Sequence, residues 1–294
     1  TVALASGNAV TLDVSGDKLL NVQVDEGALN ALVHNGGVIR ADGGRVLMTT
    51  QAAGRLLNSS VNNTGVIQAQ TLENRNGTIR LLGDMQSGTV TVSGTLDASG
   101  RGTGQTGGEV SITGQHVGLV NRAKIDATGD AGGVTVLVGG GFQGNHPSLQ
   151  NAAATFMSAD STISADALTN GSGGKIVLWA NDATRVYGSL AARGGARGGD
   201  GGAIETSGRW LDVSGIDVNA SAPRGQGGTW ELDPNDITIQ LAGTNTNVTP
   251  SPDFTSTNDA AIVTTGSIEA ALNFGTSVVV STGAGGTQAG NILV

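Results

Sequence analysis

Hydrophobic and polar positions alternate along this chain in short segments that recur at a nearly constant spacing. The clearest segment is an aliphatic residue, a variable and mostly polar residue, Ala, and then a small or polar residue. It occurs seven times, at Ile39–Asp42, Ile67–Gln70, Leu96–Ser99, Ile125–Thr128, Ile163–Asp166, Leu190–Arg193 and Val218–Ser221. Successive alanines are 28, 29, 29, 38, 27 and 28 residues apart. Alternation of period two predicts a strand with its aliphatic residue and Ala on one face.

A second alternating segment follows each copy, in six of the seven cases just after a Gly-Gly pair. These segments are Val46–Met48, Ile79–Leu81, Val110–Ile112, Val134–Val136, Ile176–Leu178, Ile204–Thr206 and Trp230–Leu232. A third segment precedes the next copy in several periods, as at Val90–Val92, Val117–Val120, Arg185–Val186 and Leu211–Val213. Each period therefore predicts three short strands and three turns.

Three strands per period favour a solenoid, because each strand can stack on its equivalent one period later. We predict an all-β fold, a parallel β-helix with three strands per coil, in which Gly supplies positive φ and close backbone approach at the corners. The alternative is a sandwich or barrel, whose hairpins would use turns such as Asn76-Gly77 and Asn170-Gly171. Hairpin folds do not require seven copies of one motif in register.

The long spacing of 38 residues predicts an insertion. The excess falls in residues 142–157, which lack alternation, and insertions in solenoids emerge as side loops, often on a binding face. A surface excursion without a ligand is the competing interpretation. Short helices are predicted at Gln51–Leu57 and at Ile268–Leu272, the latter capped by Ser267 and ended by Gly275. Strands are expected to resume at Ser277–Ser281 and Asn291–Val294.

Composition narrows the function classes. Gly and Pro total 49 and 5 of 294 residues, about 18%, below the roughly 25–30% of low-complexity disorder. The net charge of −9 argues against a nucleic-acid partner. Cys is absent, which excludes disulfides and thiol chemistry. No apolar run has the length of a membrane span, and no cofactor is expected.

Several strings resemble the large exoproteins of two-partner secretion, the filamentous-haemagglutinin-like adhesins of Gram-negative bacteria. They are Asn74–Gly83, Gly94–Ser99, Gly141–Gly144, Gly173–Ala180 and Gly228–Ile239. The resemblance covers nearly the whole chain. It implies a right-handed β-helix, export through a dedicated outer-membrane transporter, and a role in adhesion or in binding biofilm matrix.

The resemblance and the repeat together suggest a domain plan, the resemblance for residues 1–60 and the repeat pattern for the rest. Residues 1–60 are similar to the tail of the family's export domain, residues 61–235 form regular coils with the side loop, and residues 236–294 form an interruption with a short helix before coils resume. The family's Asn-Pro-Asn-Leu and Asn-Pro-Asn-Gly-Ile export motifs do not occur, and Asp233–Asp236 is the nearest match. We interpret the chain as a piece of a longer protein.

Two motifs for enzyme chemistry are weak. Gly102–Gly107 matches a dinucleotide fingerprint, with Asp126 at a suitable distance, but an alternating strand follows where the phosphate site needs a helix. The carboxylates of Asp97 and Asp126 would stack one rung apart and are the best candidates for glycoside hydrolysis, the main alternative class. Pectin-hydrolase motifs are absent, so we predict no enzyme activity and no metal site, with ordinary solvated carboxylates.

Candidate ligand-binding residues lie in the side loop and on strands. They are Gln143, Asn145, His146, Trp179 and Trp210. We expect the two tryptophans to point outward, where they either stack on sugar rings or pack under a loop. The histidines at 34, 116 and 146 are too separated to form a joint site. Trp230 is predicted to point inward. Six sequons, at Asn58, Asn62, Asn76, Asn170, Asn219 and Asn247, either accept glycans or serve turns and amide ladders.

These observations predict a secreted rod within a surface adhesin, which presents binding surfaces for glycans or exopolysaccharide at fixed pitch. Weak contacts would add through multivalency. The expected partners are the outer-membrane transporter during export and a polysaccharide or host glycan. The alternatives are a β-helical carbohydrate-active enzyme and the stalk of a contact-dependent toxin.

Overall fold

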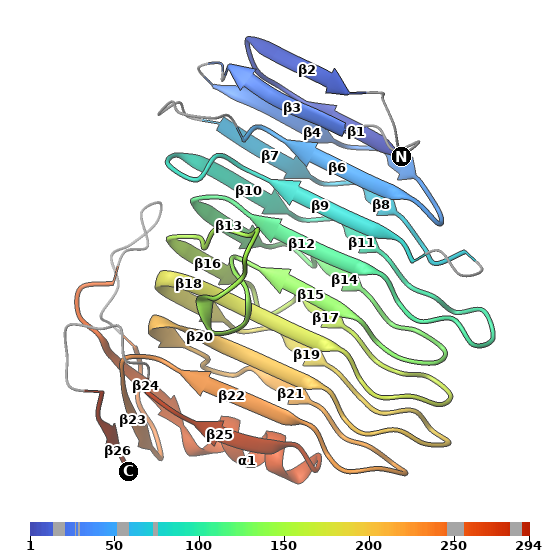
Figure 1. The fold of residues 1–294 in the computed structure, drawn as a ribbon. Helices are drawn as coiled ribbons and strands as arrows, with labels where there is room; N and C mark the ends of the chain where they lie inside the picture. Colours follow the sequence, from blue (N-terminus) through green and yellow to red (C-terminus); the bar gives the residue numbers. More distant parts are fainter. Residues whose placement is uncertain are drawn as a thin grey trace.

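The computed structural model describes residues 1–13, 21–26, 28, 30–51, 59–72, 76–245, 256–282 and 290–294. The chain winds into a stack of coils, with the N-terminus at one end of the stack and the C-terminus at the other (Figure 1). Each regular coil contributes strands to three faces, and equivalent strands pair in parallel from coil to coil. The fold is therefore a parallel β-helix, as the repeat predicts. The helix predicted at Gln51–Leu57 lies almost entirely outside the described residues.

The first face is a seven-stranded sheet built from the Ala-containing repeat. Its register aligns all seven copies, so that Ile39, Ile67, Leu96, Ile125, Ile163, Leu190 and Val218 stack in one column. The strands are β5 (Val38–Arg40), β8 (Val66–Gln68), β11 (Thr95–Asp97), β14 (Lys124–Asp126), β17 (Thr162–Ser164), β19 (Ser189–Ala191) and β21 (Asp217–Asn219). Six of the seven repeat alanines are completely buried, on the inward face that the alternation predicts.

The second face carries the segments that follow the turns. Its strands are β1 (Val2–Ala5), β6 (Arg45–Thr49), β9 (Thr78–Leu82), β12 (Glu109–Thr113), β15 (Thr135–Val138), the first part of β18 (Lys175–Val186), the first part of β20 (Ala203–Asp212), β22 (Thr229–Asp233) and β25 (Ser277–Val280). One predicted register is wrong by two residues. Val136–Val138, not Val134–Val136, aligns with Val110–Ile112. The alternation already begins at Val134, two residues before the aligned segment, so it does not mark where that segment starts.

The third face begins regularly and ends with an extra layer. It contains β4 (Ala31–Asn35), β7 (Ser59–Asn63), β10 (Gly88–Val92), β13 (His116–Leu119), β16 (Ala154–Met157) and the second parts of β18 and β20. In β18 and β20 the second and third segments fuse into one long bent strand. A separate sheet follows, in the order β24 (Ala260–Thr264), β23 (Asp236–Gln240) and β26 (Ile292–Leu293). The region predicted as an interruption therefore contains paired strands.

The two ends of the stack differ. Near the N-terminus, β2 (Ala9–Asp13) and β3 (Asn21–Glu26) form an antiparallel pair. Near the C-terminus, helix α1 (Thr265–Asn273) packs against β21, β24 and β25. The predicted helix is confirmed, but its N-cap is Thr264, and Ser267 lies buried inside the first turn. Gly275 follows the helix with φ +84°, as the predicted stop requires.

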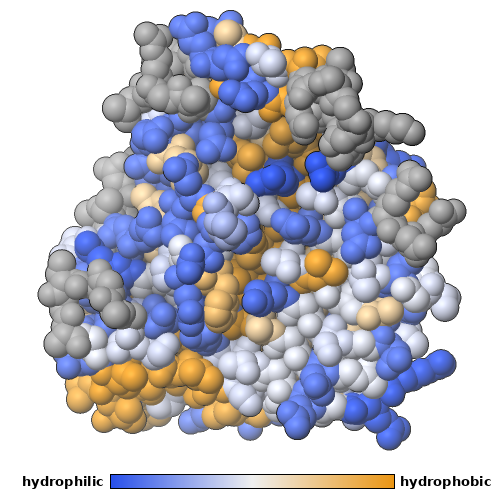
Figure 2. Space-filling model, viewed as in Figure 1, coloured by the Kyte–Doolittle hydropathy of each residue, from blue (hydrophilic) through white to orange (hydrophobic). Residues whose placement is uncertain are grey.

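Apolar side chains gather at the C-terminal end of the stack. Figure 2 shows them at the lower left, where Figure 1 places β23, β25 and β26. Exposed members include Leu241, Val279, Ile292 and Leu293. The rest of the viewed face mixes hydrophilic and intermediate residues with smaller apolar areas (Figure 2).

Glycine pairs occupy the corner between the first and second faces for a steric reason. A Cβ on Gly202 would lie 2.0 Å from the carbonyl oxygen of Gly174, the equivalent residue one coil earlier. The N–H of Gly202 also donates to the carbonyl of Ala192, which closes the coil. Neither glycine has positive φ. Close backbone approach, and not the left-handed conformation, thus explains the repeated pair.

Candidate functional site

The side loop is the main departure from regular coils, and it lies across the outer surface of the second face (Figure 1). It leaves the stack at Gly139, whose φ is +80°, and a Cβ there would lie 2.0 Å from Oγ1 of Thr155. The N–H of Ala152 donates to the carbonyl oxygen of Gly139, so both ends of the excursion meet at one point. The loop is therefore residues 140–151.

The predicted boundary of 142–157 is too late at the C-terminal side. Ala154–Met157 forms β16 and pairs with β13 and β18 on the third face. Met157 is completely buried, whereas Phe156 points outward and lies edge-on to Tyr187. The alternation is present but short, and it follows a run of three alanines that obscures it.

One carboxylate holds the tip of the side loop. Both oxygens of Glu205, on β20, accept from the backbone N–H of Gln143 at 3.0 Å. Gln143 has φ +52°, in the left-handed region, which aims this N–H at the sheet. Its side-chain amide donates to Glu231 one coil further on, at 3.3 Å. Gln143 therefore bridges two stacked carboxylates.

Glu205 is an unusual acid because its side chain is only 1% exposed. Burial raises its pKa to about 7, and the negative charges of Glu231 and Asp233 act in the same direction, against the hydrogen bond from Gln143. Glu231 lies directly beside it in register. The loop thus covers a carboxyl group that titrates near neutral pH.

An apolar cluster supports the loop from below. Leu137 and Val177 face outward on adjacent strands and are buried by Leu149 of the loop. Phe142 and Trp179 pack against the same cluster, and the ammonium of Lys175 lies 4.6 Å from the centre of the Phe142 ring. These outward positions would be solvated in a regular coil. The loop therefore behaves as a packed element with its own small core.

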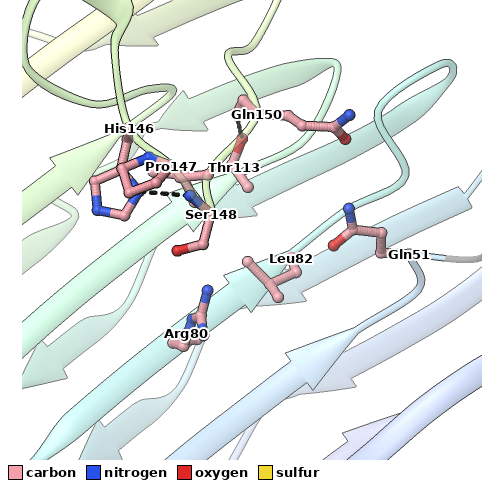
Figure 3. A pocket seen from close by; sticks show the side chains of 9 residues that line it. Gln51, Arg80, Leu82, Thr113, His146, Pro147, Ser148 and Gln150 are labelled. Carbon is pink, nitrogen blue, oxygen red and sulfur yellow. Dashed lines mark hydrogen bonds between the residues drawn. The ribbon is translucent and has the colours of Figure 1, made fainter.

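A cleft of about 310 Å³ lies beside the loop, between its second half and strands β9 and β12. Figure 3 shows Arg80 rising from β9 toward the loop segment that carries His146 and Ser148. The hydroxyl of Thr113 donates to the carbonyl oxygen of Gln150 at 2.7 Å and fixes that edge. The N–H of Ser148 donates to Nδ1 of His146 at 3.3 Å.

The structure brings four of the five predicted binding residues to this loop. Gln143, Asn145 and His146 belong to it, but only His146 lines the cleft. Trp179 lies beneath it, half-buried, with close approach to Gly140 and Gly144. Trp179 therefore packs under the side loop.

Trp210 lies elsewhere. It faces out of the coil, but β24 covers it, and its ring N–H donates to the carbonyl oxygen of Ala260 at 2.9 Å. With no exposed surface, it offers no face to a sugar in this structure. Trp230 is fully buried in the central core, as predicted.

The stacked acids Asp97 and Asp126 pair in register as predicted, and both serve turns. Each carboxylate accepts from the N–H two residues later, at 3.0 Å for Ser99 and 3.1 Å for Thr128. Asp126 is buried and also pairs with Arg101 at 2.6 Å. These contacts use the carboxylates for local hydrogen bonds.

The remaining candidates do not converge. His34, His116 and His146 lie on β4, β13 and the loop, and no cluster of three metal-ligating side chains occurs in the described ranges. Gly102–Gly107 forms a turn that leads directly into β12, without a helix. Of the sequons, Asn219 accepts from the N–H of Ser221 in a turn, while Asn58 and Asn247 lie outside the described residues.

Sequence reasoning missed Glu205 and Arg80. Both occupy the middle, outward position of second segments that the repeat itself identifies. A charged residue in that column was the available signal. Whether an outward charge lies in a site depends on which strands the side loop covers, and the sequence alone does not show which strands those are.

The fold places the chain among parallel β-helices, and a comparison with solved structures agrees. The crystal structure of the HMW1 secretion domain from Haemophilus influenzae matches with a TM-score of 0.60 and 24% sequence identity. The match covers 79% of this chain and 57% of that one, so the chain spans little more than half of the matched protein's length. No protein-family model matches the sequence, and no curated protein matches it.

Among the described residues, no helix combines the length and the hydropathy that a membrane crossing requires.

Proposed function

We propose that this chain is a segment of a secreted two-partner-secretion exoprotein that acts as a non-enzymatic, rod-like adhesive scaffold. The stack would hold the side loop at a fixed place, and the loop would contact glycans or exopolysaccharide. The observation that carries the proposal is a packed, anchored insertion at residues 140–151 on the regular middle coils of the described β-helix. Repetition suits a spacer, and a built insertion suits a contact site.

Two further arguments support export and surface location. The fold resembles a domain whose name is a secretion domain, and the motif strings of the sequence resemble exoproteins of this type. The chain also lacks Cys, as suits passage across an oxidising periplasm. On this proposal the partner during export is an outer-membrane transporter, and the mature protein is displayed at a Gram-negative cell surface.

Domain roles follow the same scheme. Residues 1–60 would be the tail of a secretion-type domain, residues 61–235 the spacer with its loop, and residues 236–294 a modified coil region. The continuous pairing of β4 with β7 suits a single rod without a hinge between the first two parts.

A glycan array tests the adhesive role. The chain would be compared with a variant that joins Gly139 directly to Ala152 and so lacks residues 140–151. That junction imitates the preceding coil, where Thr113 leads directly to Gly114. We expect the intact chain to bind a subset of glycans and the deletion to lose them.

The matched control changes a distant corner, with Pro223→Ser and Arg224→Ser, and should bind as the intact chain does. Circular dichroism and thermal melting would establish that both variants keep the β-helix. Absence of binding by the intact chain, or unchanged binding after deletion of the loop, would contradict the proposal.

A further inference from the structure

We infer that the cleft beside the side loop binds an acidic saccharide through one carboxylate, with Arg80 as the anion-binding group. The inference rests on the proposed function and names the chemical class of glycan. It depends on the charge, burial and lining of the cleft.

Arg80 is a cation without a partner among the residues that the structure describes. Its Nε is buried and forms no hydrogen bond, and the guanidinium makes no ion pair with any residue the structure describes. Its neighbours in the outward column are Leu47 and Ser111, which supply no charge. A buried donor left without a hydrogen bond is destabilising, and more so when it belongs to a charged group. An incoming anion would remove that destabilisation.

Other arginines of the stack show the contrast. Arg101 and Arg193 lie against Asp126 and Asp166 at 2.6 and 2.7 Å. Arg209 pairs with both Asp182 and Asp259. A carboxylate thus matches the guanidinium group of Arg209, which is partly buried, and also those of Arg101 and Arg193, which are about half exposed. The cleft presents the same group with no acid among the described residues that line it.

The lining favours a sugar over a simple anion. Amide and hydroxyl groups come from Gln51, Ser148 and Gln150, while Leu82, Pro147 and Leu149 supply apolar surface. Sugar rings combine hydroxyl groups with apolar C–H faces, and both surfaces would be matched here. A volume of about 310 Å³ lies at the lower end of the range for small-molecule sites.

A polyphosphate partner fits poorly. Nucleic acids bind through several cations at once, and the described residues that line the cleft include one Arg and no Lys. The chain carries a net charge of −9, which would repel an extended polyanion. A short saccharide with one buried carboxylate requires only the local contact with Arg80.

Calorimetric titration of the whole 294-residue chain tests the inference. The probe is a trigalacturonate, compared with its methyl-esterified form, which has the same rings without the negative charge. We expect the acid to bind at least tenfold more tightly than the ester, because a guanidinium–carboxylate pair is a charge-assisted and often bidentate contact. Arg80→Gln should remove that preference.

Two further variants make the result specific. Arg224→Gln removes an exposed charge at a distant corner and should leave both affinities unchanged. Ser148→Trp fills the cleft from the loop side and leaves Arg80 in place. It should lower the affinity for the trigalacturonate at least tenfold. Thermal melting of each variant would show that the fold is retained.

Several outcomes would overturn the inference. They are equal affinity for acid and ester, an unchanged preference in Arg80→Gln, or binding of a sulfated or phosphorylated trisaccharide but not the carboxylate. Glycan-array binding that needs the loop but not Arg80 would overturn this inference and leave the proposed function intact. Absence of any glycan binding by the intact chain would overturn both this inference and the proposed function.

Discussion

The first and second faces of the stack are built from the same coils, yet they use their outward positions differently. On the first face the outward column runs through Gln68, Asp97, Asp126 and Ser164, where the two aspartates accept from the N–H two residues later. On the second face the equivalent column contains Leu137, Val177 and Glu205, all buried by the side loop. On the first face, which the side loop does not cover, the outward aspartates form local hydrogen bonds. On the second face, which the loop covers, the outward residues are buried by long-range packing.

This difference teaches where chemistry can arise in a solenoid. A repeated strand places each outward side chain beside similar neighbours, in similar solvent. Only an insertion changes the environment of a few rungs, and it does so for Glu205 and Arg80 without altering the ladder beneath.

The largest effect is expected at the corner that the two faces share. Gly202→Ala places a Cβ 2.0 Å from the carbonyl oxygen of Gly174, so the two coils must separate. We expect a loss of about 3 kcal/mol in the free energy of unfolding, as for severe overpacking, measured by urea denaturation. Gly37→Ala is the matched control, since its Cβ would meet nothing within 4 Å. Equal stability of the two variants would contradict the stacking argument.

The covered face should give a pH-dependent effect of similar size. Burial raises the pKa of Glu205 from 4.5 to about 7, so the folded state holds a proton that the unfolded state releases in this interval. The contribution of Glu205 to stability is therefore most favourable below pH 4.5 and declines as pH rises to 7. The loss is at most about 3 kcal/mol.

The measurement is unfolding by urea at several pH values between 4.5 and 7.5. Glu205→Gln should show a smaller decline in stability over this range than the unmodified chain. Glu269→Gln, on the exposed surface of α1, should follow the unmodified chain. If Glu205→Gln retained the full decline, Glu205 would not be the titrating group.

The uncovered face should give the smallest effect. Asp97→Ala removes the acceptor for the N–H of Ser99 and for the amide of Gln70. We expect a loss of about 1 kcal/mol in the free energy of unfolding. Asp97→Asn keeps an acceptor oxygen for the turn and should recover most of it. A loss with Asn as large as that with Ala would show that charge, and not the turn, is what Asp97 contributes.

Sequence predicted the ladder well because its cause is local and repeated. Every copy of the Ala-containing motif lies in the expected column, and Trp230 and α1 are where the pattern puts them. Errors arise where the alternation begins before the aligned segment, as at Val134, or where three alanines hide the start of β16. Alternation alone does not determine how many residues a turn contains.

The site was less predictable, because its contacts cross many residues of sequence. Gln143 meets Glu205 across 62 residues, and Trp210 is covered by Ala260 across 50. Periodicity shows that such side chains point outward but not what lies over them. The loop's position was foreseen from the long spacing, whereas its anchor and its cleft required the structure.

The direction of the ladder hydrogen bonds has a mechanical consequence. Strands run across the stack, so the bonds between coils lie along its axis, and the two chain ends are at opposite ends of that axis (Figure 1). Tension applied through the ends would load one inter-coil row at a time, and coils would peel away in sequence at modest force. A side loop that ties β15, β18, β20 and β22 together would make the middle of the stack the last part to yield.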